Sequence, residues 1–141
     1  MTHMITEKIL LIDDDADDQV FFSDALKGIG GNLDCKTAGN GLEGLNLLNT
    51  GFVPDVIFLD LNMPHMNGFE FLRALRAKNE CQGIPVVIFT TSSHQRDIDL
   101  SQELGAQAFL TKPNTLQNLR DSIRQLITAD LTEFSQQMQI F

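Results

Sequence analysis

At 141 residues, 43% hydrophobic and 21% charged, the chain has the length and composition of one soluble globular domain and not of a disordered segment. Its formal net charge of −9 argues against general binding to nucleic acid, which requires clustered Lys and Arg, and is compatible with a cationic partner or a divalent metal. No apolar stretch reaches the ~18 residues of a membrane span, and the N-terminal residues lack the apolar region of a secretory signal. Cys35 and Cys81 have no metal-ligand spacing and are interpreted as structural thiols in a reducing cytoplasm. We therefore expect a cytoplasmic protein with no membrane contact.

Short apolar runs alternate with amphipathic segments along the chain. The apolar runs predict five strands, at Lys8–Asp13, Cys35–Ala38, Pro54–Asp60, Ile84–Thr90 and Ala108–Lys112. The amphipathic segments predict five helices, over residues 17–27, from Asn40-Gly41 onward, and over 68–78, 95–104 and 116–128. Nearly continuous apolar strands are typical of a parallel sheet that is buried on both faces. The strict alternation therefore predicts a doubly wound α/β fold with helices on both sides.

We expect residues 1–128 to form this single domain and residues 129–141 to form a C-terminal extension. Leu131, Phe134, Met138 and Phe141 fall at helical spacing within the extension. This spacing favours a helical extension that packs on its own domain, and a partner-binding segment is the alternative.

Polar side chains stand at the carboxyl ends of four of the predicted strands. Asp13 and Asp14 end the first, Asp60 ends the third, Thr90 the fourth and Lys112 the fifth. In an open parallel α/β sheet, the carboxyl ends of the strands line one crevice, in which ligands bind. We therefore expect several carboxylates, one hydroxyl and one ammonium to meet at a single place.

The residue types at this place indicate metal and phosphate chemistry. Three carboxylates in one pocket repel, because two unit charges ~4 Å apart interact by about 4 kcal/mol at an effective dielectric near 20. Mg²⁺ removes this conflict, and it is favoured over zinc because these runs contain no Cys or His. Thr90 and Lys112 suit an oxyanion beside the metal. The set is what phosphoryl transfer to a carboxylate needs, with Asp60 as the best candidate nucleophile because it stands alone at the tip of its strand.

Four motifs occur in order on the expected strands, namely ILLIDDD, PDVIFLDLNMPHMNGFEFL, IPVVIFTTS and GAQAFLTKP. Each motif alone is weakly specific, whereas the four together are highly specific. From Lys8 to about Thr128 the chain resembles a response-regulator receiver domain of two-component signalling, of the stand-alone, chemotaxis-receiver-like kind. The resemblance implies a flavodoxin-like parallel sheet with the strand order 2-1-3-4-5 and five helices.

The resemblance also implies a Mg²⁺ site with four protein ligands. Asp14 would bind the metal directly and Asp13 mostly through water. Asp60 would be a further ligand, and Asn62 would supply its backbone carbonyl. The side chains of Asn62 and Ser92 would flank the route of the attacking water, which makes both residues candidates for tuning the phosphoryl lifetime.

Phosphorylation and switching are implied by the same resemblance. Asp60 would be the phosphoacceptor, Thr90 would hydrogen-bond the phosphoryl group, and Lys112 would form an ion pair with it. Phe109 lies at the aromatic switch position, where its ring would turn inward as Thr90 moves toward the phosphoryl group. Since Phe109 is not Tyr, the switch lacks a hydroxyl, and a packing switch is what this sequence supports. Pro113 resembles the family residue whose preceding peptide bond is usually cis.

Several polar residues near the site are expected to have no chemical role. Asp15 is interpreted as an exposed residue or a cap of the first helix, with a metal role as the alternative. Asp17 and Asp18 are interpreted as charges at the helix N-terminus and not as ligands. His65 and His94 are interpreted as ordinary exposed loop residues.

The sequence therefore predicts a stand-alone receiver that takes a phosphoryl group from a histidine kinase or phosphotransfer protein. It would bind no nucleic acid and would act through a downstream protein target or a homodimer. The surface formed by the fourth helix, fifth strand and fifth helix is the expected contact. A receiver-like binding module that is never phosphorylated is the main alternative. A flavodoxin-like cofactor binder or a small Mg²⁺ hydrolase is disfavoured by the acidic first loop and by the lack of an insertion long enough to form a lid.

Overall fold

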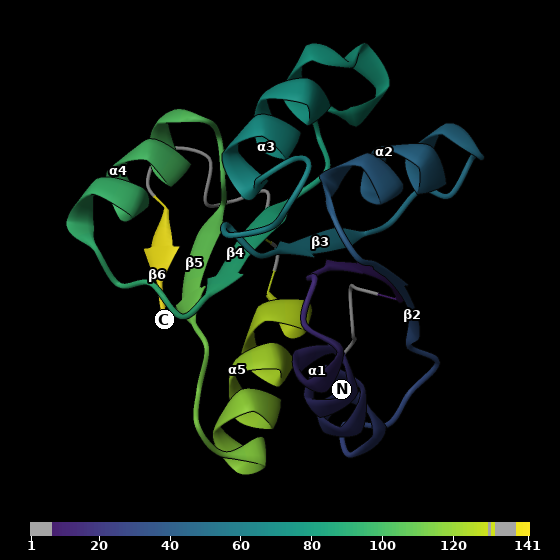
Figure 1. Cartoon of the computed structure of the whole chain (residues 1–141). Coiled ribbons are helices and arrows are strands. Elements are labelled where there is room, and N and C mark those ends of the chain that lie inside the picture. Colours follow the sequence, from purple (N-terminus) through teal and green to yellow (C-terminus); the bar gives the residue numbers. More distant parts are fainter. Residues whose placement is uncertain (1–6, 130, 132–137) are drawn as a thin grey trace.

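The computed structural model describes residues 7–129, 131 and 138–141, which form one parallel sheet flanked by helices (Figure 1). The sheet order is β2-β1-β3-β4-β5-β6, with the strands β1 (Lys8–Ile12), β2 (Asp34–Ala38), β3 (Val56–Leu59), β4 (Val86–Thr90), β5 (Ala108–Thr111) and β6 (Gln139–Ile140). The helices are α1 (Ala16–Lys27), α2 (Gly41–Asn49), α3 (Gly68–Ala77), α4 (Gln95–Glu103) and α5 (Leu116–Thr128), and a 3₁₀ turn spans Asn79–Cys81. Every neighbouring pair of strands is parallel. The predicted fold, its five helices and the order of its first five strands are confirmed.

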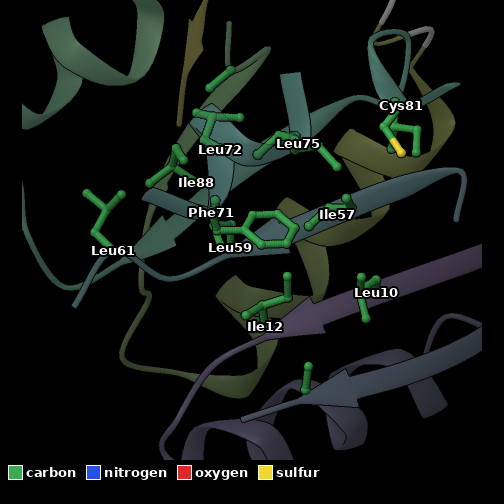
Figure 2. Close-up of a cluster of buried hydrophobic side chains, with 14 of the residues drawn as sticks. Leu10, Ile12, Ile57, Leu59, Leu61, Phe71, Leu72, Leu75, Cys81 and Ile88 are labelled. Atoms are coloured by element: carbon green, nitrogen blue, oxygen red, sulfur yellow. The ribbon is translucent and has the colours of Figure 1, made fainter. Parts of the chain in front are cut away.

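Alternate residues of the central strands point to opposite faces of the sheet, and each face has its own helices. Figure 1 shows α1 and α5 on one face and α2, α3 and α4 on the other. Leu10 and Ile12 of β1 lie in the cluster that includes Phe71 of α3 (Figure 2), whereas Ile9 and Leu11 lie in the cluster on the α1 and α5 side. Because both faces are apolar and covered, the polar groups of these strands are confined to the strand ends.

Side-chain caps set where several helices begin. The carboxylate of Asp15 accepts hydrogen bonds from the backbone N–H groups of Asp17 and Asp18, which confirms the capping role expected of Asp15. Asn67 and Glu70 form a reciprocal capping box at the start of α3. The caps of α1 and α3 matter for the site, because these helices begin directly after the loops that carry Asp13 and Asp60.

The helical prediction for the C-terminal extension is wrong at Gln139–Ile140. These residues form β6, which pairs with β5 so that Ala108 lies opposite Gln139 and Phe109 opposite Ile140. Phe134 lies outside the described residues. The physical reason is that β5 would otherwise be an edge strand with unpaired backbone groups, and the end of the chain satisfies them. The N–H of Phe141 donates to the carbonyl of Phe109 at 2.8 Å, and Figure 1 shows β6 beside β5.

None of the helices in the described part of the chain is both long and apolar enough to cross a bilayer. The longest, α5, has 13 residues. A membrane-spanning helix needs about 20 apolar residues.

Candidate functional site

Three carboxylates come together at the carboxyl edge of the sheet. Oxygen atoms of Asp13, Asp14 and Asp60 all lie within 4.8 Å of one another. Asp13 has no solvent exposure and Asp60 is also buried, whereas Asp14 is exposed. The structure therefore brings together the acidic residues that were predicted as the metal site, and it leaves one of them open to solvent.

Lys112 lies at the centre of this acidic site. Its Nζ is 2.8 Å from Asp13 Oδ2, 2.7 Å from Asp18 Oδ2 and 3.3 Å from Asp60 Oδ2, and the side chain is only 10% exposed. The ammonium also lies 5.3 Å from the centroid of the Phe89 ring. One nearly buried cation thus faces three carboxylates from three different elements.

Asp18 is the member of this site that the sequence analysis did not place there. It was interpreted as a charge at the helix N-terminus, but its carboxylate forms the shortest of the three contacts with Lys112. Helical side chains tilt toward the helix N-terminus, so a carboxylate in the first turn of α1 can reach back to the strand ends. A signal for this was present in the sequence, since the capped helix begins only two residues after Asp14.

The burial of Asp13 disfavours its charge. Burial raises the pKa of Asp13 even though the nearby ammonium of Lys112 acts in the opposite direction. Burial likewise opposes the charge of Lys112, but the contacts with Asp13 and Asp18 outweigh it and raise the pKa of that ammonium. Lys112 therefore stays protonated at neutral pH, while Asp13 has an unfavourable environment for a carboxylate.

One oxygen of Asp13 is compatible with a bound cation. Its Oδ1 accepts the backbone N–H of Asp15 at 3.0 Å, but Oδ2 has no hydrogen-bond partner among the described residues. The 2.8 Å contact of Oδ2 with Lys112 is a charge attraction without hydrogen-bond geometry. Buried carboxylate oxygens of this kind are typical ligands of hard divalent ions, so the set of Asp13, Asp14 and Asp60 fits Mg²⁺.

The hydroxyl of Thr90 lies at the end of β4, next to the acidic site along the sheet edge. Thr90 is fully buried, and its Oγ accepts the backbone N–H of Ser92 at 3.5 Å. Its carbonyl accepts the backbone N–H of Lys112 at 2.7 Å, which ties the ends of β4 and β5 together. The residues that carry the predicted hydroxyl and ammonium are thus joined through the backbone.

The two residues predicted to tune the phosphoryl lifetime lie in different settings. Asn62 is exposed in the loop between β3 and α3. The hydroxyl of Ser92 donates to Asp97 Oδ2 of α4 at 2.6 Å. Ser92 is therefore coupled to α4, a partner that the sequence did not suggest.

Phe109 has no solvent exposure and lies in the core cluster with Ile88 and Met138. The ring of the predicted switch residue is therefore already buried in this structure. Its backbone carbonyl pairs with β6, so this residue is joined to the C-terminal strand as well as to the core.

The loops around the site agree with three of the expectations and contradict one. His65 and His94 are exposed, as expected, and His65 has a positive φ of 67°. Asp17 is exposed, in agreement with its interpretation as a charge at the helix N-terminus. The cis bond expected before Pro113 is not found, because the described residues contain no cis peptide bond.

Gly68 has no side chain, and the backbone of Asp60 occupies the place where a Cβ would lie. A Cβ at Gly68 would overlap the backbone carbonyl oxygen of Asp60, while one at exposed Gly83 would meet nothing within 4 Å. We expect Gly68→Ala to lower the free energy of unfolding by about 1–3 kcal/mol, because backbone atoms cannot move aside cheaply. Urea unfolding of this variant and of the control Gly83→Ala measures the difference. Equal stability of the two variants would contradict the close approach.

The family model of the response regulator receiver domain matches residues 9–124. The chain belongs to this family. It is thus a receiver domain of two-component signalling, as the four motifs predicted. The resemblance that the sequence suggested is confirmed.

Curated relatives of this receiver include proteins of different length. The sensor histidine kinase CheAY of Helicobacter pylori is 32% identical over 120 residues, which are 84% of the chain but only 15% of that protein. The DNA-binding response regulator MtrA of Mycobacterium leprae is 35% identical over 107 residues, which are 76% of the chain and 45% of that protein. The sporulation initiation phosphotransferase F of Bacillus subtilis is 31% identical over 124 residues, with 88% of the chain and 96% of that protein covered.

Solved structures show the same fold. The phosphorylated cyanobacterial phytochrome response regulator RcpA matches with a TM-score of 0.79 and 28% identity, over 86% of this receiver and 91% of that chain. The Mn²⁺-bound form of the response regulator Rcp1 matches with a TM-score of 0.71 and 29% identity, over 85% and 91% of the two chains. The fold around the site is therefore one that other receivers share.

Proposed function

We propose that Asp60 of this receiver accepts a phosphoryl group in a Mg²⁺-dependent reaction. The observation that carries the proposal is the position of the Asp60 carboxylate, which lies 3.3 Å from the ammonium of Lys112 and within 4.8 Å of the Asp13 and Asp14 carboxylates. Such a site combines a nucleophilic oxygen, a set of metal ligands and a fixed positive charge.

The reaction is a transfer from the imidazole of a phosphohistidine to a carboxylate. An oxygen of Asp60 forms the new O–P bond as the P–N bond breaks, and the imidazole leaves with its electron pair and takes up a proton. Asp14, Asp60 and the backbone carbonyl of Asn62, with Asp13 mostly through water, would hold Mg²⁺, which when bound would supply positive charge to the phosphoryl oxygens. The other Asp60 oxygen, Oδ1, already accepts the N–H of Leu61 at 2.8 Å, which orients the carboxylate.

Two further residues bind the transferred group. Lys112 forms an ion pair with the phosphoryl oxygens, since its ammonium already faces Asp60. Thr90 donates a hydrogen bond from its hydroxyl to the same group, and the movement of Thr90 is coupled to the packing of Phe109.

Asn62 and Ser92 control how fast water reaches the acyl phosphate. These roles follow the family pattern, and the positions of Thr90 and Lys112 at neighbouring strand ends support the roles of these two residues.

The phosphodonor would be a histidine kinase or a phosphotransfer protein. Two relatives support this class of partner by their names, one being a sensor histidine kinase and the other a sporulation phosphotransferase. The phosphorylated receiver would then bind a downstream protein, or a second copy of itself, through the surface of α4, β5 and α5. The C-terminal strand β6 occupies the edge of β5 on this surface, so β6 would be part of the contact.

The test is phosphoryl uptake by the wild-type chain from a small acyl phosphate donor with Mg²⁺. We expect a mass gain of one phosphoryl group that is removed by hydroxylamine, as an acyl phosphate requires. Binding of trifluoroberyllate, a phosphoryl mimic, is measured in parallel by calorimetry. A chain that takes up no phosphoryl group and binds no mimic is a binding module, and the proposal is then wrong.

A further inference from the structure

Asp18 makes a contact that a charge at the helix N-terminus does not require. Its Oδ2 lies 2.7 Å from the Nζ of Lys112, 94 residues away in the sequence, and this contact also has hydrogen-bond geometry. Asp17, its neighbour in the same turn, is exposed and is not among the residues in contact with Lys112. The first turn of α1 therefore presents two carboxylates, of which only one reaches the site.

The ammonium of Lys112 has three N–H donors, and three carboxylates already surround it. A phosphoryl group on Asp60 brings new anionic oxygens that need one of these donors. Two of the donors already form hydrogen bonds, with Asp18 and Asp60, so the phosphoryl oxygens compete with the surrounding carboxylates for this ammonium. The question is which of the three carboxylates gives way.

Exposure distinguishes the three partners. The side chain of Asp13 is 0% exposed and that of Asp60 is 9% exposed, whereas that of Asp18 is 36% exposed. A buried carboxylate that loses its cation is left without water, while a partly exposed carboxylate can turn to solvent at little cost. Asp18 is therefore the partner that Lys112 can exchange most easily.

We propose that Asp18 is a positioning residue, which holds Lys112 while Asp60 is unmodified and competes with phosphoryl oxygens for this ammonium. The inference rests on the proposed function and extends it. Asp18 therefore lowers the affinity of the site for a phosphoryl group. It also shields the ammonium of Lys112 as long as Asp60 is unphosphorylated.

The first experiment measures trifluoroberyllate affinity by calorimetry at saturating Mg²⁺. We expect Asp18→Asn to bind the mimic about three- to tenfold more tightly than the wild type, because the competing charge is gone. Asp17→Asn is the matched control, since it removes the same charge from the same helical turn without touching Lys112. We expect its affinity to stay within about twofold of the wild type. Asp18→Glu keeps the charge, and we expect it to return the affinity toward the wild-type value.

The second experiment needs neither metal nor mimic. The rate at which a small anhydride acylates Lys112 Nζ in the metal-free chain is measured by mass spectrometry of peptides. We expect Asp18→Asn to raise this rate severalfold, since the ammonium loses its most exposed partner and becomes more accessible to the anhydride. Asp17→Asn leaves the rate unchanged. Thermal unfolding of both variants tests whether each is folded.

The outcomes separate the two proposals. A wild-type chain that binds no mimic in Mg²⁺ overturns the proposed function, and the inference with it. A wild type that binds the mimic while Asp18→Asn matches Asp17→Asn in both affinity and acylation overturns only the inference. Weaker mimic binding by Asp18→Asn than by Asp17→Asn overturns it too, because Asp18 would then support Lys112 in the bound state.

Discussion

Asp60→Asn is expected to abolish phosphoryl uptake, with a loss of at least about 1,000-fold, because an amide oxygen is not a competent nucleophile toward phosphorus at neutral pH. The change keeps the shape of the side chain and its acceptor for the Leu61 N–H, so the loop should stay in place. Intact mass after incubation with Mg²⁺ and a phosphodonor measures the uptake.

The matched control for this prediction is Asp34→Asn. Asp34 is exposed at the start of β2, opposite Lys8, and so lies at the other edge of the sheet from the site. We expect this variant to be labelled at the wild-type rate. Hydroxylamine-sensitive label on Asp60→Asn at that rate would show that another residue is the acceptor.

Removal of Mg²⁺ is expected to reduce labelling of the wild type by at least about 100-fold, because the metal contributes several kcal/mol of charge stabilisation in such transfers. The same ion should raise the melting temperature, since it binds the folded cluster of Asp13, Asp14 and Asp60 and not the unfolded chain. Labelling and thermal unfolding, each with excess chelator and with Mg²⁺, measure the two effects.

Asp14→Ala provides the control for the metal, because it removes an exposed ligand and should leave the core intact. We expect this variant to melt at the same temperature with and without Mg²⁺. Full labelling of the wild type in excess chelator, or a persistent Mg²⁺ shift in Asp14→Ala, would rule out the assigned metal site.

The thermal effect of Mg²⁺ should also depend on pH. Burial raises the pKa of Asp13 above its ordinary value of 3.8, so the folded metal-free chain holds this proton to a higher pH than the unfolded chain does. The contribution of Asp13 to the free energy of unfolding therefore falls as the pH rises from that value through the raised pKa. Because Mg²⁺ binds the deprotonated carboxylate, its effect on the melting temperature should grow as the pH rises from 3.8 through the raised pKa of Asp13. Thermal unfolding with and without Mg²⁺ over a pH series measures this dependence.

Much of the fold and of the site follows from local patterns. An unbroken apolar run of the right length predicts the position of a strand. A polar residue that ends such a run is therefore expected at the end of the strand. For Asp13, Asp60, Thr90 and Lys112, parallel pairing then puts all four ends at one edge, which is where the structure has them. The first five strands and the five helices could be predicted for the same reason.

Contacts between distant segments could not be predicted in this way. The short distance from Asp14 indicates that Asp18 lies near the strand ends, but no local pattern indicates that its carboxylate lies 2.7 Å from Lys112. The end of the chain has helical spacing, yet Gln139–Ile140 pairs with β5, because unpaired backbone groups at a sheet edge outweigh a short periodic pattern.

By itself, then, the sequence determined the strands, the helices and the edge at which the chemical groups meet, because each depends on the residues nearest to it. Only the tertiary structure decided that Lys112 is shared among three carboxylates and that the sheet ends in a sixth strand. Both features depend on residues that are distant in the sequence and come close together only in the folded chain. There the ammonium of Lys112 meets its carboxylates, and the backbone groups of β5 meet those of β6.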